Sequence, residues 1–112
     1  MAVKRVADVR WAAINAVASG DTQVLAGEAG YKYRVISVTL VCSAAISVGW
    51  KSGTTVKVPG MAFAQNGGMD VNRPTPGTYF FETNEGEDIT INLSGSATVT
   101  GSLNYVEIPV DE

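Results

Sequence analysis

Alternating apolar and polar residues dominate the last quarter of the chain, from Asp88 to Ile108. Apolar side chains recur at every second position, with Thr, Ser and Asn between them; the apolar set is Ile89, Ile91, Leu93, Ala97, Val99, Leu103 and Tyr105. A period of two is typical of a β-strand with one buried and one exposed face. Ser94-Gly95-Ser96 interrupts the alternation, so the sequence predicts two strands joined there as a closing hairpin.

Comparable patterns recur along the rest of the chain. Further strands are predicted at residues 22–26, 32–42, 44–50, 54–58 and 79–82. Turn-forming residues separate them, and Pro59-Gly60 is expected to end one strand. Residues 61–77 are rich in Gly, Pro and Asn and are predicted to be mostly loop. About eight short strands at this spacing are typical of a sandwich or barrel. We expect an all-β fold, an antiparallel β-sandwich of the jelly-roll type.

The first 18 residues fit two patterns. Val3, Ala7, Val9 and Trp11 match a strand, whereas Val6, Val9, Ala13 and Val17 match a helical stripe. No good N-cap precedes Val6, which favours an extended segment. Ser19-Gly20-Asp21 is a turn signal. We therefore expect an extended N-terminal arm at residues 1–18 and a β-sandwich domain at residues 19–112. Asn15 and the charges before Trp11 do not fit a secretion signal, so we expect synthesis in a cytoplasm.

Composition and charge narrow the function classes. Only 17% of the 112 residues are charged, below the roughly 25% that is usual, and this favours a surface partly covered by partners. Residues 79–112 carry seven acidic side chains and no basic one, whereas residues 1–34 carry five basic and three acidic ones. Such asymmetry suits docking on an assembly, or simply solubility. The absence of a basic patch disfavours nucleic acid, and no apolar stretch is long enough for a membrane span.

Residues equipped for catalysis are scarce. The chain has no histidine, the commonest general base and metal ligand. Its one cysteine, Cys42, ends an apolar set and is expected to be a buried hydrophobe. The acidic cluster has the composition for Ca²⁺ binding or glycoside hydrolysis, but its spacing fits no calcium loop and it lies at a turn: Glu82, Glu85, Glu87 and Asp88. We expect no enzymatic activity, no cofactor and no metal.

Aromatic side chains have two interpretations. A platform for sugar binding and a packed core both use such residues: Trp50, Tyr79, Phe80, Phe81 and Tyr105. Trp50 lies on the apolar face of its predicted strand, which favours the core. Trp11 and Tyr31 are better candidates for exposed contacts, because an aromatic anchor buries a large area at little cost in entropy.

Several stretches of the body form a recognisable pattern. They are Tyr33-Arg34-Val35-Ile36-Ser37, Ile46-Ser47-Val48-Gly49-Trp50-Lys51-Ser52-Gly53, Phe81-Glu82-Thr83-Asn84-Glu85-Gly86-Glu87 with Ile91-Asn92-Leu93-Ser94, and Gly101-Ser102-Leu103-Asn104-Tyr105-Val106-Glu107. In these stretches the region from Val24 to Ile108, about three quarters of the chain, resembles a group of small tailed-bacteriophage virion proteins. The resemblance implies a jelly-roll domain with a structural role, as a head decoration (cement) protein or as part of a fibre. It implies no individual binding residue.

These observations lead to two functional hypotheses. The first is a capsid decoration protein at the capsid surface of a virion, a homotrimer that is made in the host cytoplasm and binds the major capsid protein. Arm residues are expected to lie on the capsid or on a neighbouring subunit: Val3, Arg5, Val6, Val9 and Trp11. Subunit contacts are expected on the polar face of the closing segment, at Thr98, Thr100 and Asn104.

The second hypothesis is a head- or tail-fibre module that binds host-surface glycans. Its contacts would lie in the loops between Asn66 and Thr78, and the candidate residues are Asn66, Asn72 and Arg73.

Overall fold

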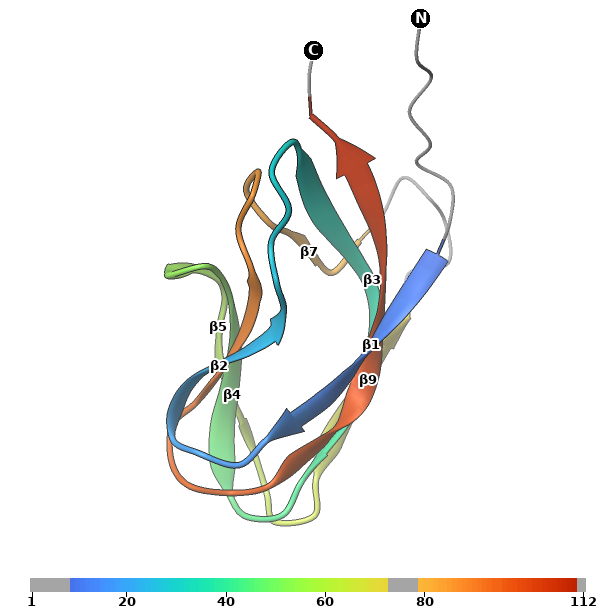
Figure 1. The fold of residues 1–112 in the computed structure, drawn as a ribbon. Helices are drawn as coiled ribbons and strands as arrows, with labels where there is room; N and C mark the ends of the chain where they lie inside the picture. The colour runs from blue at the N-terminus through green and yellow to red at the C-terminus, as the bar shows by residue number, and fades with distance from the viewer. Residues whose placement is uncertain (1–8, 73–78, 111–112) are drawn as a thin grey trace, which may run out of the picture.

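The computed structural model describes residues 9–72 and 79–110, which form nine strands in two antiparallel sheets packed face to face (Figure 1). Sheet A has the order β1 (Val9–Ala16), β9 (Val99–Pro109), β3 (Tyr31–Cys42) and β6 (Gly68–Asn72), and the short β7 (Phe81–Glu82) also pairs with β3. Sheet B has the order β2 (Gly20–Leu25), β8 (Ile89–Leu93), β4 (Ile46–Ser52) and β5 (Thr55–Phe63). The predicted all-β sandwich is confirmed. Within the described ranges no helix is long and apolar enough to span a bilayer.

The strands pair in reverse order along the chain. β1 pairs with β9, β2 with β8, β3 with β6, and β4 with β5. The chain is thus one long antiparallel ribbon, rolled so that successive pairs fall in opposite sheets, which is the jelly-roll arrangement. β7 is an addition to this scheme. Hydrogen bonds from the main-chain nitrogens of Phe80 and Thr83 to the carbonyls of Val35 and Tyr33 hold it against β3.

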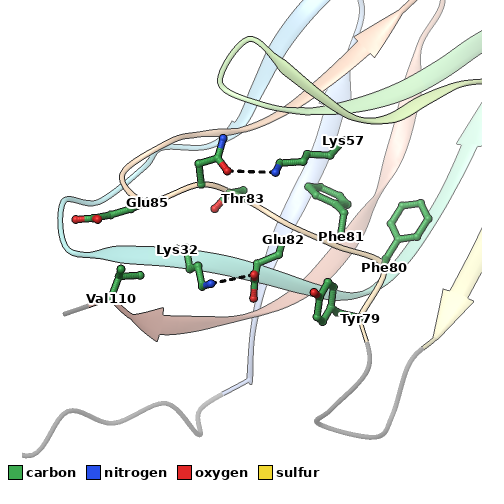
Figure 2. Close-up of a pocket in the computed structure, with 10 residues that line it drawn as sticks. Lys32, Lys57, Tyr79, Phe80, Phe81, Glu82, Thr83, Glu85 and Val110 are labelled. Atoms are coloured by element: carbon green, nitrogen blue, oxygen red, sulfur yellow. Dashed lines mark hydrogen bonds and ion pairs between the residues drawn. The ribbon is translucent and has the colours of Figure 1, made fainter. Parts of the chain in front are cut away.

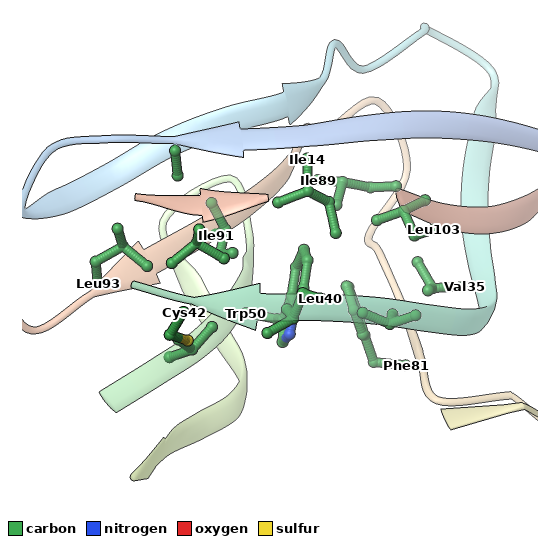
Figure 3. Packing of buried hydrophobic residues seen from close by; sticks show 14 of the residues in the cluster. Ile14, Val35, Leu40, Cys42, Trp50, Phe81, Ile89, Ile91, Leu93 and Leu103 are labelled. Carbon is green, nitrogen blue, oxygen red and sulfur yellow. The ribbon is translucent and has the colours of Figure 1, made fainter. Parts of the chain in front are cut away.

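The inner faces of the two sheets form one apolar core (Figure 3). Trp50 of β4 is fully buried near its centre, and its ring lies 5.7 Å from that of Phe81. The expected apolar face of the last two strands is also buried: Ile89, Ile91, Leu93, Val99 and Leu103. Cys42 is buried, as predicted, and burial raises the pKa of its thiol. These assignments follow from alternation, because every second side chain of a strand faces the opposing sheet.

The predicted closing hairpin is wrong in its pairing. β8 pairs with β2 and β4 in sheet B, whereas β9 pairs with β1 and β3 in sheet A. The connection between them crosses from one sheet to the other. It is held by a hydrogen bond from the main-chain nitrogen of Ser94 to Ser47 and by one from Ser43 to Thr98. Alternation identified the buried face of each strand correctly. It does not predict the pairing, because a strand shows the same alternation whichever strand lies beside it.

Residues 9–16 lie in the sandwich, although the sequence assigned them to an arm at residues 1–18. They form β1, which pairs with β9 over its whole length. The reason is an alternation that continues into the body: Ile14 is 2% exposed, Ala16 is fully buried and Ala12 packs beside them. The extended conformation expected for this stretch is confirmed. Residues 1–8 lie outside the described part of the chain.

The predicted loop at residues 61–77 contains a strand that the sequence concealed. β6 pairs with β3, and Gly68 permits this because a Cβ there would collide with the carbonyl of Leu40. The preceding strand β5 also continues past Pro59 and Gly60, where a stop was expected. β5 is an edge strand, so Pro59 removes no essential hydrogen bond from the ladder. Gly68 therefore marks a close approach between two strands, and Pro59 marks an edge strand. Neither residue marks a loop here.

Candidate functional site

The outer face of sheet A is an uncharged surface over most of its area. Strand register and alternation place twelve residues on this surface, and the term "outer face of sheet A" refers to them from here on. They are Val9, Trp11, Ala13, Asn15, Ser37, Thr39, Val41, Asp70, Thr100, Ser102, Asn104 and Val106. Asp70 is the one charged residue of this set, and it accepts a hydrogen bond from the Thr39 hydroxyl. Strand register also places the charged side chains of Arg34 and Glu82 on the same side of the sheet, at its β7 end. Val9, Trp11 and Val41 are among the most exposed large apolar residues of the described chain. Such a face costs little to desolvate where its short polar side chains find new hydrogen bonds.

One edge of this face, β1, is the least protected edge of the sandwich. Of the other edge strands, β5 carries Lys57 and Pro59, β2 contains a bulge, and β6 and β7 are short. β1 runs for eight residues without Pro or Gly, and its outer edge pairs with no other described strand. Its one charged side chain, Arg10, is paired with Glu107 at 3.2 Å. Long, apolar, unblocked edges are sites where another strand can add.

Two of the predicted arm residues lie on this edge. Trp11 is 69% exposed and stands directly opposite Asn104 of β9, while Val9 stands opposite Val106. The exposure expected for Trp11 is confirmed, whereas Tyr31, at the start of β3, is half-buried. Val3, Arg5 and Val6 lie outside the described residues.

The predicted subunit contacts separate into two groups. Thr100 and Asn104 lie on the outer face of sheet A, in the same face as Trp11. Thr98 lies before β9, in the connection between the sheets, and its main-chain nitrogen donates a hydrogen bond to the Ser43 hydroxyl. The structure thus brings Asn104 together with the exposed tryptophan and leaves Thr98 apart from them.

The predicted glycan contacts do not form a common loop site. Asn66 lies in the turn before β6, with a positive φ of 65°, and Asn72 is the last residue of β6. Their strand neighbours on β3 are Cys42 and Ser37, so the two amides lie about 17 Å apart along the sheet. Arg73 lies outside the described residues.

The four acidic residues singled out in the sequence are separated by their hydrogen bonds. Glu82 contacts Lys32 at 3.0 Å and Arg34 at 2.8 Å, while Asp88 accepts a hydrogen bond from the main chain of Gly27. Glu87 binds Ser52 and Asn84, and Glu85 is exposed: these side chains do not converge. Among the described residues no three potential ligands are grouped for a metal ion. The cluster is a set of structural contacts around a turn.

A pocket of about 510 Å³, which the sequence interpretation did not identify as a site, opens beside β7 (Figure 2). Its walls include six side chains from β3, β5 and the β7 segment: Lys32, Lys57, Tyr79, Glu82, Asn84 and Glu85. The sequence allows Tyr79 a place in a sugar-binding platform, but the charged residues that surround it come together only in the fold. The pairing of β3 with β7 brings these residues together, and the sequence contains no signal that predicts this pairing.

No protein-family model matches the chain, and a search of curated proteins finds no match. The likeness to small phage virion proteins thus remains a prediction from the sequence.

Proposed function

We propose that this protein is a structural component of a tailed-phage virion, a capsid decoration protein that docks on the head shell through β1 and the outer face of sheet A. The observation that carries the proposal is the outer edge of β1, which pairs with no other described strand and on which Trp11 and Val9 are exposed without Pro or Gly between them. The resemblance of the body to small virion proteins supplies the kind of partner, the major capsid protein.

The proposed contact combines backbone and side-chain contributions. A strand of the shell protein adds to the edge of β1, and main-chain hydrogen bonds give affinity. Trp11 acts as the anchor, because buried aromatic residues dominate interface energies. The Thr, Ser and Asn side chains around Asn104 are short and find hydrogen bonds at low desolvation cost. Many copies on a symmetric shell, as homotrimers in this proposal, gain avidity from modest individual contacts.

The proposal includes no catalytic role. Within the described ranges, the best-placed carboxylates are already engaged: Glu82 with Lys32 and Arg34, Glu87 with Ser52 and Asn84. The alternative of a fibre module with contacts at Asn66, Asn72 and Arg73 has less support, because Asn66 and Asn72 lie at opposite ends of β6.

The test is binding to purified phage heads that lack the protein. Trp11→Ser is expected to reduce occupancy roughly tenfold or more while the free energy of unfolding changes by less than about 0.5 kcal/mol, because the side chain is largely exposed. Val56→Ser, another exposed apolar residue in a different sheet, is the matched control and is expected to bind normally.

Deleting residues 1–8 in a separate variant tests the contribution of Val3, Arg5 and Val6. Unchanged occupancy of the Trp11→Ser protein, with binding lost only on that deletion, would move the contact from β1 to the preceding residues. Failure of the unaltered protein to bind any head would refute the decoration role. Electron microscopy of decorated particles shows whether the outer face of sheet A meets the shell and whether copies cluster in threes.

A further inference from the structure

The pocket beside β7 lies at the edge of sheet A opposite to β1. The segment 79–85 crosses here from β3 of sheet A toward β5 of sheet B, and its outward side chains line the pocket (Figure 2). A volume of about 510 Å³ lies within the range of small-ligand sites. The chemistry of its walls therefore indicates which ligand it fits.

Tyr79 is held in place by its neighbours. The guanidinium of Arg34 lies over the ring, 4.8 Å from its centre. Arg34 is itself fixed by two contacts with Oε2 of Glu82, at 2.9 Å from Nε and 2.8 Å from the second nitrogen. Tyr79 nevertheless keeps 41% of its surface exposed, and it lines the pocket. A ring that is already oriented offers a stacking surface whose ordering adds little entropic cost to binding.

The opposite wall is also ordered. Nζ of Lys57 donates a hydrogen bond to Oδ1 of Asn84 at 3.2 Å, and Nδ2 of Asn84 donates to Oε1 of Glu87 at 3.1 Å. The main-chain nitrogen of Asn84 donates to the buried hydroxyl of Ser52. An ammonium group has three donors, so Lys57 retains capacity for a ligand oxygen. The carboxylate of Glu85 is exposed at the same pocket and can accept a hydrogen bond from a ligand hydroxyl.

Charge in the pocket is balanced. Lys32 and Lys57 oppose Glu82 and Glu85, so the four ionised groups that line it sum to zero. An anionic ligand would meet two carboxylates, and a purely apolar ligand would cover the exposed polar groups of the walls without giving them hydrogen-bond partners. The walls fit an uncharged molecule with one flat apolar face and several hydroxyl groups.

We propose that the pocket binds a neutral saccharide. One face of a pyranose ring stacks on Tyr79. Hydroxyls of the following sugar units accept from Lys57 and donate to Glu85, which lies six residues further along the extended segment. This site differs from the loop residues Asn66 and Asn72. The proposal does not depend on capsid docking, because Trp11 and Tyr79 lie at opposite edges of sheet A.

The test uses the full chain labelled with ¹⁵N and three neutral probes: maltotriose, cellotriose and a β-galactotriose. Trigalacturonic acid is the charged comparison, and a glycan array extends the neutral set. At least one neutral probe is expected to shift the amide signals of segment 79–85 and of Lys32. Tyr79→Ala is expected to weaken that binding roughly tenfold or more, and Tyr79→Phe to preserve it, because stacking needs the ring and not the hydroxyl.

Two further variants separate the pocket from the surrounding surface. Lys57→Met, which keeps the apolar stem and loses the donors, is expected to weaken binding several-fold. Val56→Ala changes the exposed neighbour of Lys57 that does not line the pocket, and it is expected to bind as the unaltered chain does. Absence of binding to every neutral glycan, binding of the acidic probe alone, or unchanged affinity after Tyr79→Ala would each overturn the proposal. Thermal unfolding confirms that each variant is folded.

Discussion

Ser52 and Glu87 join β4 to the turn that follows β7, through a hydrogen bond of 2.7 Å from the Ser52 hydroxyl to Oε1 of Glu87. The same hydroxyl accepts a hydrogen bond of 2.8 Å from the main-chain nitrogen of Asn84. Ser52 is fully buried, so no water replaces these partners. One small side chain thereby fixes the wall of the pocket that carries Asn84 and Lys57.

Replacing Ser52 with Ala is expected to lower the free energy of unfolding by about 1–3 kcal/mol, because it removes two partly buried hydrogen bonds that each contribute about 0.5–1.5 kcal/mol. Urea denaturation followed by circular dichroism measures the change. Ser96→Ala, in the exposed connection after β8, is the matched control and is expected to change stability by less than about 0.5 kcal/mol. Equal stability of the two variants would show that the Ser52 contacts contribute nothing.

Stability is expected to fall in acid through Glu82. Burial raises the pKa of this carboxyl, but hydrogen bonds and charge from Lys32 and Arg34 outweigh burial and bring it below its ordinary value of 4.5. Because the folded-state pKa lies below the unfolded one, the contribution is complete above about pH 4.5 and is lost as the pH falls through the folded value. Unfolding free energies measured by urea titration from pH 7 to pH 3 should therefore decline in that window.

Glu82→Gln is expected to make this decline shallower, whereas Glu85→Gln, at an exposed turn position, should leave it nearly unchanged. Glu107 acts with the opposite sign. Burial and a hydrogen bond with Glu28 raise its pKa, so the stability that it contributes is lost as the pH rises through its folded value. An identical acid limb in the Glu82→Gln and unaltered proteins would contradict the assignment to Glu82.

Local alternation predicted which side chains are buried, but not which strands are neighbours. Trp50 and Cys42 were expected in the core and lie there, and Trp11 was expected to be exposed and is. Alternation of β8 and β9 is compatible with a hairpin or with membership of opposite sheets, and the choice depends on the partners available to each strand. A residue pattern within one strand contains no information about those partners.

The candidate sites illustrate the same division. Trp11 could be identified from its own surroundings in the sequence. The orientation of Tyr79 could not, because Arg34 and Glu82 are 48 residues apart and meet only when β3 pairs with β7. β6 was not predicted for a further reason. Gly68 is needed there for the close approach to Leu40, but glycine at this position is equally typical of a loop.

Gly101 is predicted to be intolerant of any side chain. It lies in β9 between Ile14 of β1 and Leu40 of β3, and a Cβ there would collide with the carbonyl of Thr39. Gly101→Ala is expected to destabilise the protein by about 1–3 kcal/mol, as overpacked sites do. At Gly95 a Cβ would meet only a methyl group of Ile46 at an ordinary 3.6 Å, so Gly95→Ala is the control. Equal chemical denaturation midpoints would contradict the tight β3–β9 approach.

The two tryptophans of the chain provide an optical test of the fold, because they lie in opposite environments. Trp11 is 69% exposed on the edge of sheet A, and Trp50 is fully buried between the sheets. In a Trp11→Phe variant, the remaining emission from Trp50 is expected to be blue-shifted and nearly insensitive to iodide. In a Trp50→Phe variant, emission from Trp11 is expected to be red-shifted and strongly quenched. Binding to phage heads should then protect Trp11 from iodide if β1 is the docking edge, and quenching that stays unchanged in the bound state would place the contact elsewhere.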